Sequence, residues 1–285
     1  MSLGLGKNDS AHSDLAKASF DHVREIIRSN RYGGHTAGLC DGFLQCNLVI
    51  LPQGPADEFE AFCHKNPTPC PLIEKSKVGS FNFEMLGKSI DLRTDLPLYN
   101  IYDHGKHVDQ VRDITSLWRD DLVAFAVGCS FTFERALSAA GIAMRHVEED
   151  VTVPMFKTNK MTTPAGAFGG QTVVSMRPIK HDDLQTVFSI CEKYPHAHGV
   201  PIHTGDPSKI GITDLNKPDW GAAVSVFEDE LPVFWGCGVT TQAAVAHAKP
   251  EICITHAPGA MLITDIDELS NSDWRPAVPP EENYP

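Results

Sequence analysis

The stretch Asp120–Gly141, DDLVAFAVGCSFTFERALSAAG, decides the fold of this chain more than any other. Its apolar run Leu122–Val127 leads through Gly128-Cys129-Ser130 into Phe131–Ala140, where apolar residues recur at helical spacing and Gly141 follows as a stop. The pattern predicts a strand, a tight turn and a helix. Backbone N–H groups at the start of such a helix favour negative charge, and α/β sheets often hold their ligands there.

A second stretch near the C-terminus repeats this order. The apolar run Leu231–Trp235 is followed by Gly236-Cys237-Gly238 and by a helical pattern over Thr240–Lys249. If the two units shared one sheet, Cys129 and Cys237 would lie at the same edge of it. The match is short. Chance, or the strand–turn–helix pattern common to α/β proteins, accounts for such a repeat more often than shared function does.

Working outward, strands and helices alternate along the rest of the chain, which favours an α/β fold. Strands are predicted at Phe43–Leu51, Leu98–Tyr102, His107–Val111, Glu251–Thr255 and Met261–Thr264, and helices over Ser13–Asn30 and from Pro55 onward. The segment 142–196 differs, because alternation over Met144–Val153, a strand at Thr172–Ile179 and a helix over Asp182–Tyr194 suggest a small α+β layer. We therefore predict a main α/β domain formed by 1–141 and 197–285, with an inserted subdomain at 142–196.

Composition narrows the functional classes. The chain has 285 residues, 42% of them hydrophobic, and a formal net charge of −13. This charge argues against binding to nucleic acid or to anionic membranes, because both need basic patches that neutralise phosphate. No apolar run approaches the ~18 residues of a membrane span.

The cysteines and the N-terminal sequence indicate the compartment. Eight cysteines without any C-x-x-C pair, mostly among apolar neighbours, predict reduced and buried thiols rather than disulfides or structural zinc. The first residues carry no apolar core of a signal peptide. We expect a cytoplasmic protein.

Cys129 and Cys237 are the first candidates for chemistry. A helix N-terminus lowers the pKa of a thiol and makes it a better nucleophile. The alternative is that cysteine is simply small enough for a crowded turn. Glu134, in the first turn of the same helix, is either a general acid or base near Cys129 or an acid that complements the helix dipole. Ser130 is most simply an N-cap, and a hydroxyl at such a turn often also contacts a ligand.

Histidines supply further candidates. His203 and Asp206 lie three residues apart on a turn and either share a proton or form an ordinary Asx turn beside a surface histidine. His256 also follows a strand. The group His196, His198 and His203 lacks any metal-binding spacing, so we expect no metal. The sequence has no G-x-G-x-x-G after a strand and no P-loop, so we expect no nucleotide cofactor.

Polar residues in apolar or acidic settings are candidates for substrate binding. Arg93 and Arg177 can hold carboxylates bidentately, although Arg93 has Asp91 and Asp95 as local partners. Gln45 and Asn47 interrupt an apolar strand and would face either a ligand cleft or a buried hydrogen-bond network.

Eight long blocks of this sequence resemble the bacterial family named putative hydro-lyase, which is related to a region of mitochondrial D-glutamate cyclase. The blocks are GHTAGLCDGFLQCNLVILP, FCHKNPTPCPL, DLRTDLP, ITSLWRDDLVAFAVGCSFTFERAL, GGQTVVSMRPI, IHTGDPSKIGI, PVFWGCGVTTQAAV and ITHAPGAMLITD, from about Arg31 to Asp265. The resemblance implies a lyase that eliminates water, or cyclisation of D-glutamate to 5-oxo-D-proline. It also implies a mixed-sheet α/β sandwich with a smaller two-layer α+β part.

Lactam formation from glutamate assigns roles to these residues. The turns at Gly128-Cys129-Ser130 and Gly236-Cys237-Gly238 would stabilise the oxyanion, and Glu134 or His203 with Asp206 would move protons. Arg177 or Arg93 would hold the carboxylates, assisted by Asn159 and Thr240. The expected partner is a small carboxylate or amino acid, and the oligomeric state stays open, although enzymes of this size often form homo-oligomers. The alternatives are a non-catalytic small-acid binding protein and a cysteine-dependent acyl-transfer enzyme.

Overall fold

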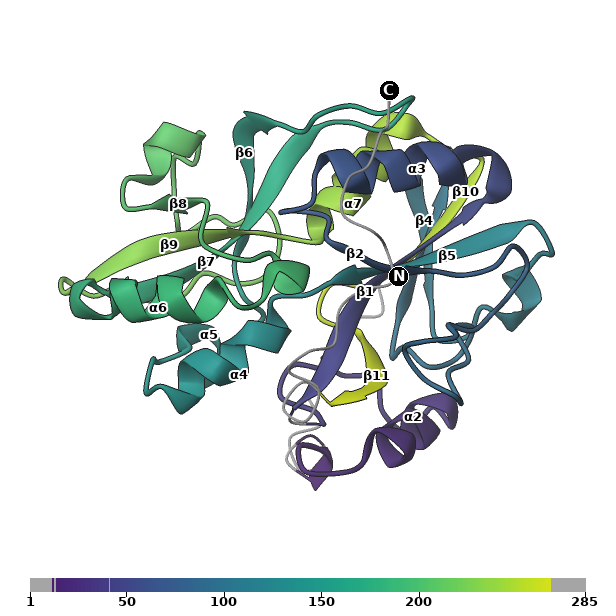
Figure 1. Cartoon of the computed structure of the whole chain (residues 1–285), viewed down its shortest axis with the longest axis horizontal. Coiled ribbons are helices and arrows are strands. Elements are labelled where there is room, and N and C mark those ends of the chain that lie inside the picture. Colours follow the sequence, from purple (N-terminus) through teal and green to yellow (C-terminus); the bar gives the residue numbers. More distant parts are fainter. Residues whose placement is uncertain (1–11, 13, 41, 268–285) are drawn as a thin grey trace.

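A computed structural model describes residue 12 and residues 14–40 and 42–267. The described chain forms an α/β fold built on two sheets, which lie side by side in Figure 1. Every described pairing between named strands is antiparallel, whereas a mixed sheet was expected. The expected α/β fold is therefore confirmed, but the described strands pair in one sense only.

The larger sheet has seven strands in the order β2-β5-β1-β10-β3-β4, with β11 also paired to β1. Its strands are β1 (Phe43–Pro52), β2 (Leu72–Lys75), β3 (Tyr99–Asp103), β4 (Lys106–Val111), β5 (Leu122–Gly128), β10 (Ile252–His256) and β11 (Leu262–Asp267). Strand β1 is buried on both faces. Its alternate residues Leu48 and Ile50 pack into one hydrophobic core, and Val49 and Leu51 pack into another. This explains why its sequence is apolar almost throughout.

The smaller sheet has the order β6-β7-β9-β8. Its strands are β6 (Met155–Met161), β7 (Gln171–Lys180), β8 (His203–Thr204) and β9 (Glu230–Gly236). Strands β8 and β9 come after position 196, so the predicted subdomain boundary falls inside the part of the chain that forms this sheet. The sequence could not indicate this, because β9 reads as one more buried strand of the kind that fills the larger sheet.

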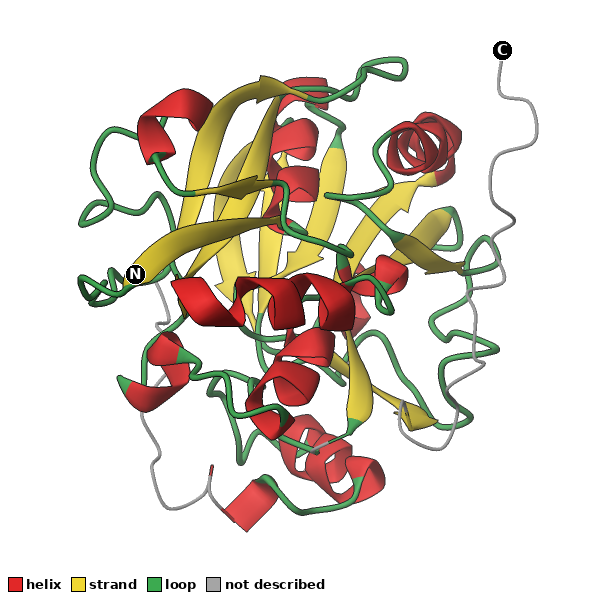
Figure 2. Ribbon diagram, turned by 60° about the vertical axis from the view of Figure 1, so that its left-hand side comes forward, coloured by secondary structure: helices red, strands yellow, loops and turns green. Residues whose placement is uncertain are grey.

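Helices cover the outer faces and the junction of the two sheets (Figures 1 and 2). The α-helices are α2 (Phe20–Arg28), α3 (Gln53–Lys65), α4 (Phe131–Ala139), α5 (Arg145–Glu148), α6 (Leu184–Cys191) and α7 (Val239–Ala248). Short 3-10 helices are η1 (Thr115–Leu117), η2 (His181–Asp183), η3 (Pro195–Ala197) and η4 (Pro207–Ile210). Helices α3 and α7 share a core with the larger sheet, whereas α4 and α6 share one with the smaller sheet.

Most predicted elements are present within a few residues of their expected bounds, including both strand–turn–helix units. Four elements differ. Helix α2 begins after Ser19, whose side chain accepts the capping hydrogen bond from the His22 N–H, and Ser13 lies outside the described residues. The alternation over Met144–Val153 does not form a strand, because the short helix α5 occupies it. Two strands, β2 and β6, were not predicted; β2 has only four residues, and the second half of β6 is exposed and polar.

Candidate active site

The two Gly-Cys turns meet at one small cavity, although their strands belong to different sheets. Strand β5 of the larger sheet leads into α4, and β9 of the smaller sheet leads into α7. We call the space between them the turn cavity. Its polar lining residues are Asn47, Cys129, Ser130, Thr152, Ser175, His198, Cys237 and His256. The expectation of one shared sheet edge is wrong, yet both thiols line the same cavity.

The turn cavity has a volume of about 30 Å³, with room for roughly two water molecules or a group of carboxyl size. Close approach of neighbouring backbone and side chains explains a glycine in each of the two Gly-Cys turns. A Cβ on Gly238 would lie 2.2 Å from the Asn47 Nδ2, and one on Gly128 would lie 1.7 Å from the His196 carbonyl oxygen. Asn47 is held in turn because its Nδ2 donates to the Val127 carbonyl at 3.3 Å.

Two helix N-termini border this cavity, and neither has a side-chain cap. The capping position of α4 is Ser130, whose hydroxyl makes no bond to the first turn, and that of α7 is Gly238. The predicted N-cap role of Ser130 is therefore wrong, because its Oγ instead accepts a hydrogen bond from Arg177 at 2.8 Å. Both helix ends keep the partial positive charge that favours an anionic group.

The thiols do not have the character of nucleophiles. Burial raises the pKa of Cys129 well above its ordinary value, against the opposing hydrogen bond from the Phe131 N–H. Burial likewise raises the pKa of Cys237 to about 11. Both are therefore protonated at neutral pH, and the expected lowering of the thiol pKa by the helix ends does not occur because burial outweighs it.

Two neutral histidines complete the lining. Burial lowers the pKa of His198 to about 4 and that of His256 to about 4. The His198 Nδ1 lies 2.9 Å from the Thr68 carbonyl oxygen, so in the neutral ring it donates and Nε2 carries the lone pair. The His256 Nδ1 lies 3.2 Å from the Leu48 backbone nitrogen and 3.3 Å from the Leu48 carbonyl oxygen, so these contacts accommodate either tautomer of the neutral ring. The His198 ring therefore has its acceptor at Nε2, and the His256 ring offers a donor at Nε2 when its Nδ1 accepts from the Leu48 N–H.

A buried charge network lies directly behind the turn cavity. Arg177 is fully buried, and it donates to the Ser175 hydroxyl at 3.0 Å and, through Nε, to a Glu134 oxygen at 2.9 Å. The other Glu134 oxygen lies 3.3 Å from the His146 Nε2. Burial alone would raise the pKa of Glu134, but the charges of Arg177 and His146 and their hydrogen bonds lower it to about 2.

This network changes the roles expected for its members. Glu134 remains ionised at any physiological pH, so it is not a proton donor there, and it holds Arg177 in place. Arg177 is already paired with Glu134, and its guanidinium lies beside the stacked rings of Phe133 and Trp235, 5.3 and 5.2 Å from their centres. Its hydrogen bonds connect it to the turn cavity through Ser130 and Ser175.

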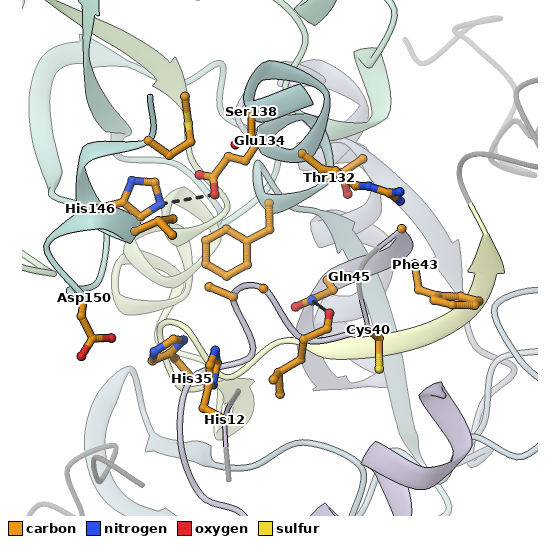
Figure 3. A pocket seen from close by; sticks show the side chains of 18 of the residues that line it. His12, His35, Cys40, Phe43, Gln45, Thr132, Glu134, Ser138, His146 and Asp150 are labelled. Atoms are coloured by element: carbon orange, nitrogen blue, oxygen red, sulfur yellow. Dashed lines mark hydrogen bonds and ion pairs between the residues drawn. The ribbon is translucent and has the colours of Figure 1, made fainter. Parts of the chain in front are cut away.

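A second and much larger space lies on the other side of the first turn of α4. This helix cavity has a volume of about 640 Å³, within the range of small-molecule sites, and Figure 3 shows its lining. Glu134 and His146 line it, so the charge network joins the two cavities. Phe131, which is partly buried, lines both.

Four predicted residues line neither cavity, and local partners explain their positions. Asp206 caps η4 by accepting from the Ser208 N–H at 3.0 Å, and the His203 Nε2 lies 2.8 Å from the Asp206 carbonyl oxygen. Arg93 forms a bidentate pair with Asp91 at 2.8 and 2.7 Å. Asn159 is exposed on β6. The structure thus favours an Asx turn for His203 and Asp206 and a local ion pair for Arg93.

Thr240 also lies outside both cavities. Its hydroxyl accepts from the Val173 N–H at 3.0 Å and so ties α7 to β7. Thr240 therefore helps to hold the second Gly-Cys turn, and it does not line the cavity where contact with substrate was expected.

Within the described part of the chain, no group of three or more His, Cys, Asp or Glu residues could hold a metal ion. No described helix has the length and apolar character needed to cross a bilayer.

Comparisons with known proteins place the chain in a family. The sequence model of the D-glutamate cyclase family matches residues 123–265, which include both Gly-Cys turns. A protein of Dinoroseobacter shibae named "Putative hydro-lyase" is 53% identical over 257 residues, which cover 90% of this chain and 84% of that protein. Proteins of the same name from Verminephrobacter eiseniae and Bordetella pertussis are each 51% identical, covering 89% and 88% of this chain and 92% and 91% of theirs.

The chain therefore belongs to the D-glutamate cyclase family and is similar to bacterial proteins named as hydro-lyases. The resemblance drawn from the sequence blocks is confirmed. Among solved structures, a nitrogen repressor-like protein from Methanococcus jannaschii covers 86% of this chain and 97% of its own, with a TM-score of 0.37 and 8% identity. That likeness is too weak to carry any argument about this chain.

Proposed function

We propose that this protein is a carbon–oxygen lyase that eliminates water from a small amino or carboxylic acid, in the manner of a D-glutamate cyclase. One observation carries the proposal. Two uncapped helix N-termini and two neutral histidines surround one buried cavity of carboxyl size. Family membership supports a hydro-lyase-like function independently.

In the cyclisation of glutamate, the amine attacks the side-chain carboxyl carbon and a C–N bond forms. One carboxyl oxygen becomes an oxyanion, which the N–H groups at the starts of α4 and α7 stabilise. The C–O bond to the other carboxyl oxygen, which carries the proton of the carboxylic acid, then breaks. The proton that the amine gave up joins this hydroxyl group, which leaves as water, and the oxyanion re-forms the carbonyl. Atoms and charge balance, so no oxidant, reductant or cofactor is needed.

The histidines divide the proton transfers. His198 accepts the amine proton at Nε2, and His256 donates through Nε2–H to the departing oxygen. A bound carboxylate favours the charged form of a nearby histidine, so substrate binding raises both pKa values from about 4 toward the working pH. Rotation of the partly buried Phe131 would open the cavity to the rest of the substrate.

The test incubates the protein with D-glutamate, L-glutamate, other amino acids and small hydroxy acids. Mass spectrometry follows a loss of about 18 Da, the mass of water, which the elimination in the proposed general acid–base mechanism requires. We expect His256→Asn and His198→Gln to lower turnover by about 100-fold or more. His203→Gln is the matched control and should keep full turnover, because His203 lines neither cavity. Equal losses in all three variants would refute the assignment.

The rival function is a non-catalytic small-acid binding protein. It is favoured by the scarcity of proton carriers at neutral pH, since both thiols are protonated, both histidines have a low pKa and Glu134 is locked to Arg177. Saturable binding of one of these acids, measured by calorimetry, without any mass change across the panel would establish this alternative.

A further inference from the structure

The helix cavity contains buried polar atoms that no described group satisfies. They are the Gln45 Oε1, the Thr132 Oγ1 and the His35 Nδ1, and all three residues line this cavity. Figure 3 shows Gln45 and Thr132 on one side of the view and His35 on the other. Buried polar groups in proteins nearly always have partners, so three in one cavity point to a ligand that supplies them.

Gln45 fixes one requirement of that ligand. Its Nε2 donates to the Thr36 carbonyl at 3.0 Å and to the Leu39 carbonyl at 3.1 Å, which sets the orientation of the amide. Its Oε1 is left as a pure acceptor on a side chain that is only 5% exposed. The ligand must therefore present an N–H or O–H group here.

Thr132 and His35 add groups that can also donate. Thr132 lies in the first turn of α4, is 7% exposed, and has a hydroxyl that can donate as well as accept. Burial lowers the pKa of His35, so the ring is neutral and either nitrogen can carry the proton. These two groups suit a carbonyl oxygen of the ligand.

Charged residues of both signs line the cavity, namely Glu134, Asp150 and Arg135, so the lining does not select strongly for an anion or a cation. The buried carboxylate of Glu134 has both oxygens occupied, one by Arg177 and one by His146. It needs no cationic group from a ligand, and its negative charge disfavours an anionic one. Apolar side chains, including Leu39, make up much of the remaining wall.

We propose that the helix cavity is a second ligand site, which binds a small neutral amide or lactam through Gln45 Oε1, Thr132 Oγ1 and His35 Nδ1. A lactam pairs an N–H donor with a carbonyl acceptor, as these atoms require. The product of the cyclisation proposed above contains a lactam ring, but the site stands on the buried atoms alone. Its test measures binding and needs no turnover, so the two proposals fail separately.

The experiment titrates the full chain with 2-pyrrolidinone and with γ-butyrolactone, a ring of the same size that lacks the N–H group. Binding is followed by NMR shifts of the protein. We expect saturable binding of the lactam and binding of the lactone at least about fivefold weaker, because the lactone leaves the Gln45 acceptor unpaired. Absence of saturable lactam binding, or equal binding of both rings, would overturn the proposal.

Variants on one helix locate the site. Thr132→Val removes a hydroxyl that bonds to no described group, so the variant should fold normally and bind the lactam about fivefold more weakly. Ser138→Ala changes an exposed hydroxyl at the rim of the same cavity and should bind as the unmodified chain does. A fully folded Thr132→Val variant with unchanged affinity for the lactam would contradict the assignment. A further probe is 5-oxo-D-proline, whose added carboxylate should weaken binding if the site selects a neutral ligand.

Discussion

Glu134→Gln is the substitution that most directly tests the buried charge network behind the turn cavity. The change keeps the size of the side chain and an acceptor oxygen for the Arg177 Nε, but it removes the only charge of opposite sign that Arg177 contacts among the described residues. Arg177 is fully buried, so it cannot regain water without local opening. A buried cation without its partner is among the costliest defects in a protein interior.

The magnitude follows from this burial. Removing one partner of a buried ion pair costs about 3–5 kcal/mol. The rings of Phe133 and Trp235 face the Arg177 guanidinium at 5.3 and 5.2 Å and retain about 1–2 kcal/mol of cation–π attraction. We therefore expect a loss of about 3 kcal/mol in the free energy of unfolding, measured by urea denaturation at pH 7.

Two comparisons separate lost pairing from general damage. Glu148→Gln removes the carboxylate of another Arg–Glu pair, with Arg145 at 3.0 Å, but the Glu148 side chain is 54% exposed, so this change should cost less than about 1 kcal/mol. The double variant Glu134→Gln/Arg177→Met removes the stranded cation and should be more stable than Glu134→Gln alone. A loss below about 1 kcal/mol for Glu134→Gln, or no recovery in the double variant, would refute the reasoning.

Three further predictions concern the turn cavity. The unfolding free energy should fall by about 3 kcal/mol for each of His198 and His256 as the pH drops from about 6.5 to 4. The reason is that their folded pKa of about 4 lies below the ordinary 6.5, so the unfolded chain binds more protons in that window. Urea titrations at pH 7 and 4.5 check this, and His256→Asn should make the stability depend less on pH. Iodoacetamide should alkylate Cys129 and Cys237 of the folded chain at least about 100-fold more slowly than an ordinary thiol, as followed by peptide mass spectrometry. Rapid alkylation of Cys129 that the substrate prevents would instead support a cysteine-dependent acyl-transfer enzyme. Gly238→Ala should lower stability by about 1–3 kcal/mol because its Cβ would meet the Asn47 amide, while Gly54→Ala, in open space on α3, should leave stability equal or slightly higher in thermal melts.

The strands and helices could be predicted because burial leaves a strong periodic signal in the sequence. Strand β5 is apolar at every position since both of its faces are covered, and α4 alternates at helical spacing because one side packs on the smaller sheet. Strand β6 lacks that signal, since only part of it is buried. Pairing direction depends on contacts between distant residues, so the antiparallel sheets could not be derived from periodicity.

The site residues could be predicted only where a polar side chain lies within or directly after an apolar strand. Asn47 and His256 were found because they interrupt or follow apolar runs. His203, Asp206 and Arg93 looked equally suitable, but their nearest partners lie within three residues and satisfy them locally.

The charge network could not be predicted, because its members are far apart in the sequence. Glu134 pairs with Arg177 across 43 positions and with His146 across 12, distances at which no local motif forms. His198 was considered only as a metal ligand, since its pairing with the Thr68 carbonyl spans 130 positions.

The Pro67–Pro71 loop gives the repeated Gly-Cys turns a common physical cause. The Gly128 N–H donates to the Pro71 carbonyl at 2.9 Å, and a Cβ on Gly236 would lie 2.9 Å from the Thr68 carbonyl oxygen. One loop therefore contacts both turns, and each turn has a glycine where that contact is made. Two units in different sheets that pack on the same loop are constrained alike, and this shared contact explains the echo between them better than chance does.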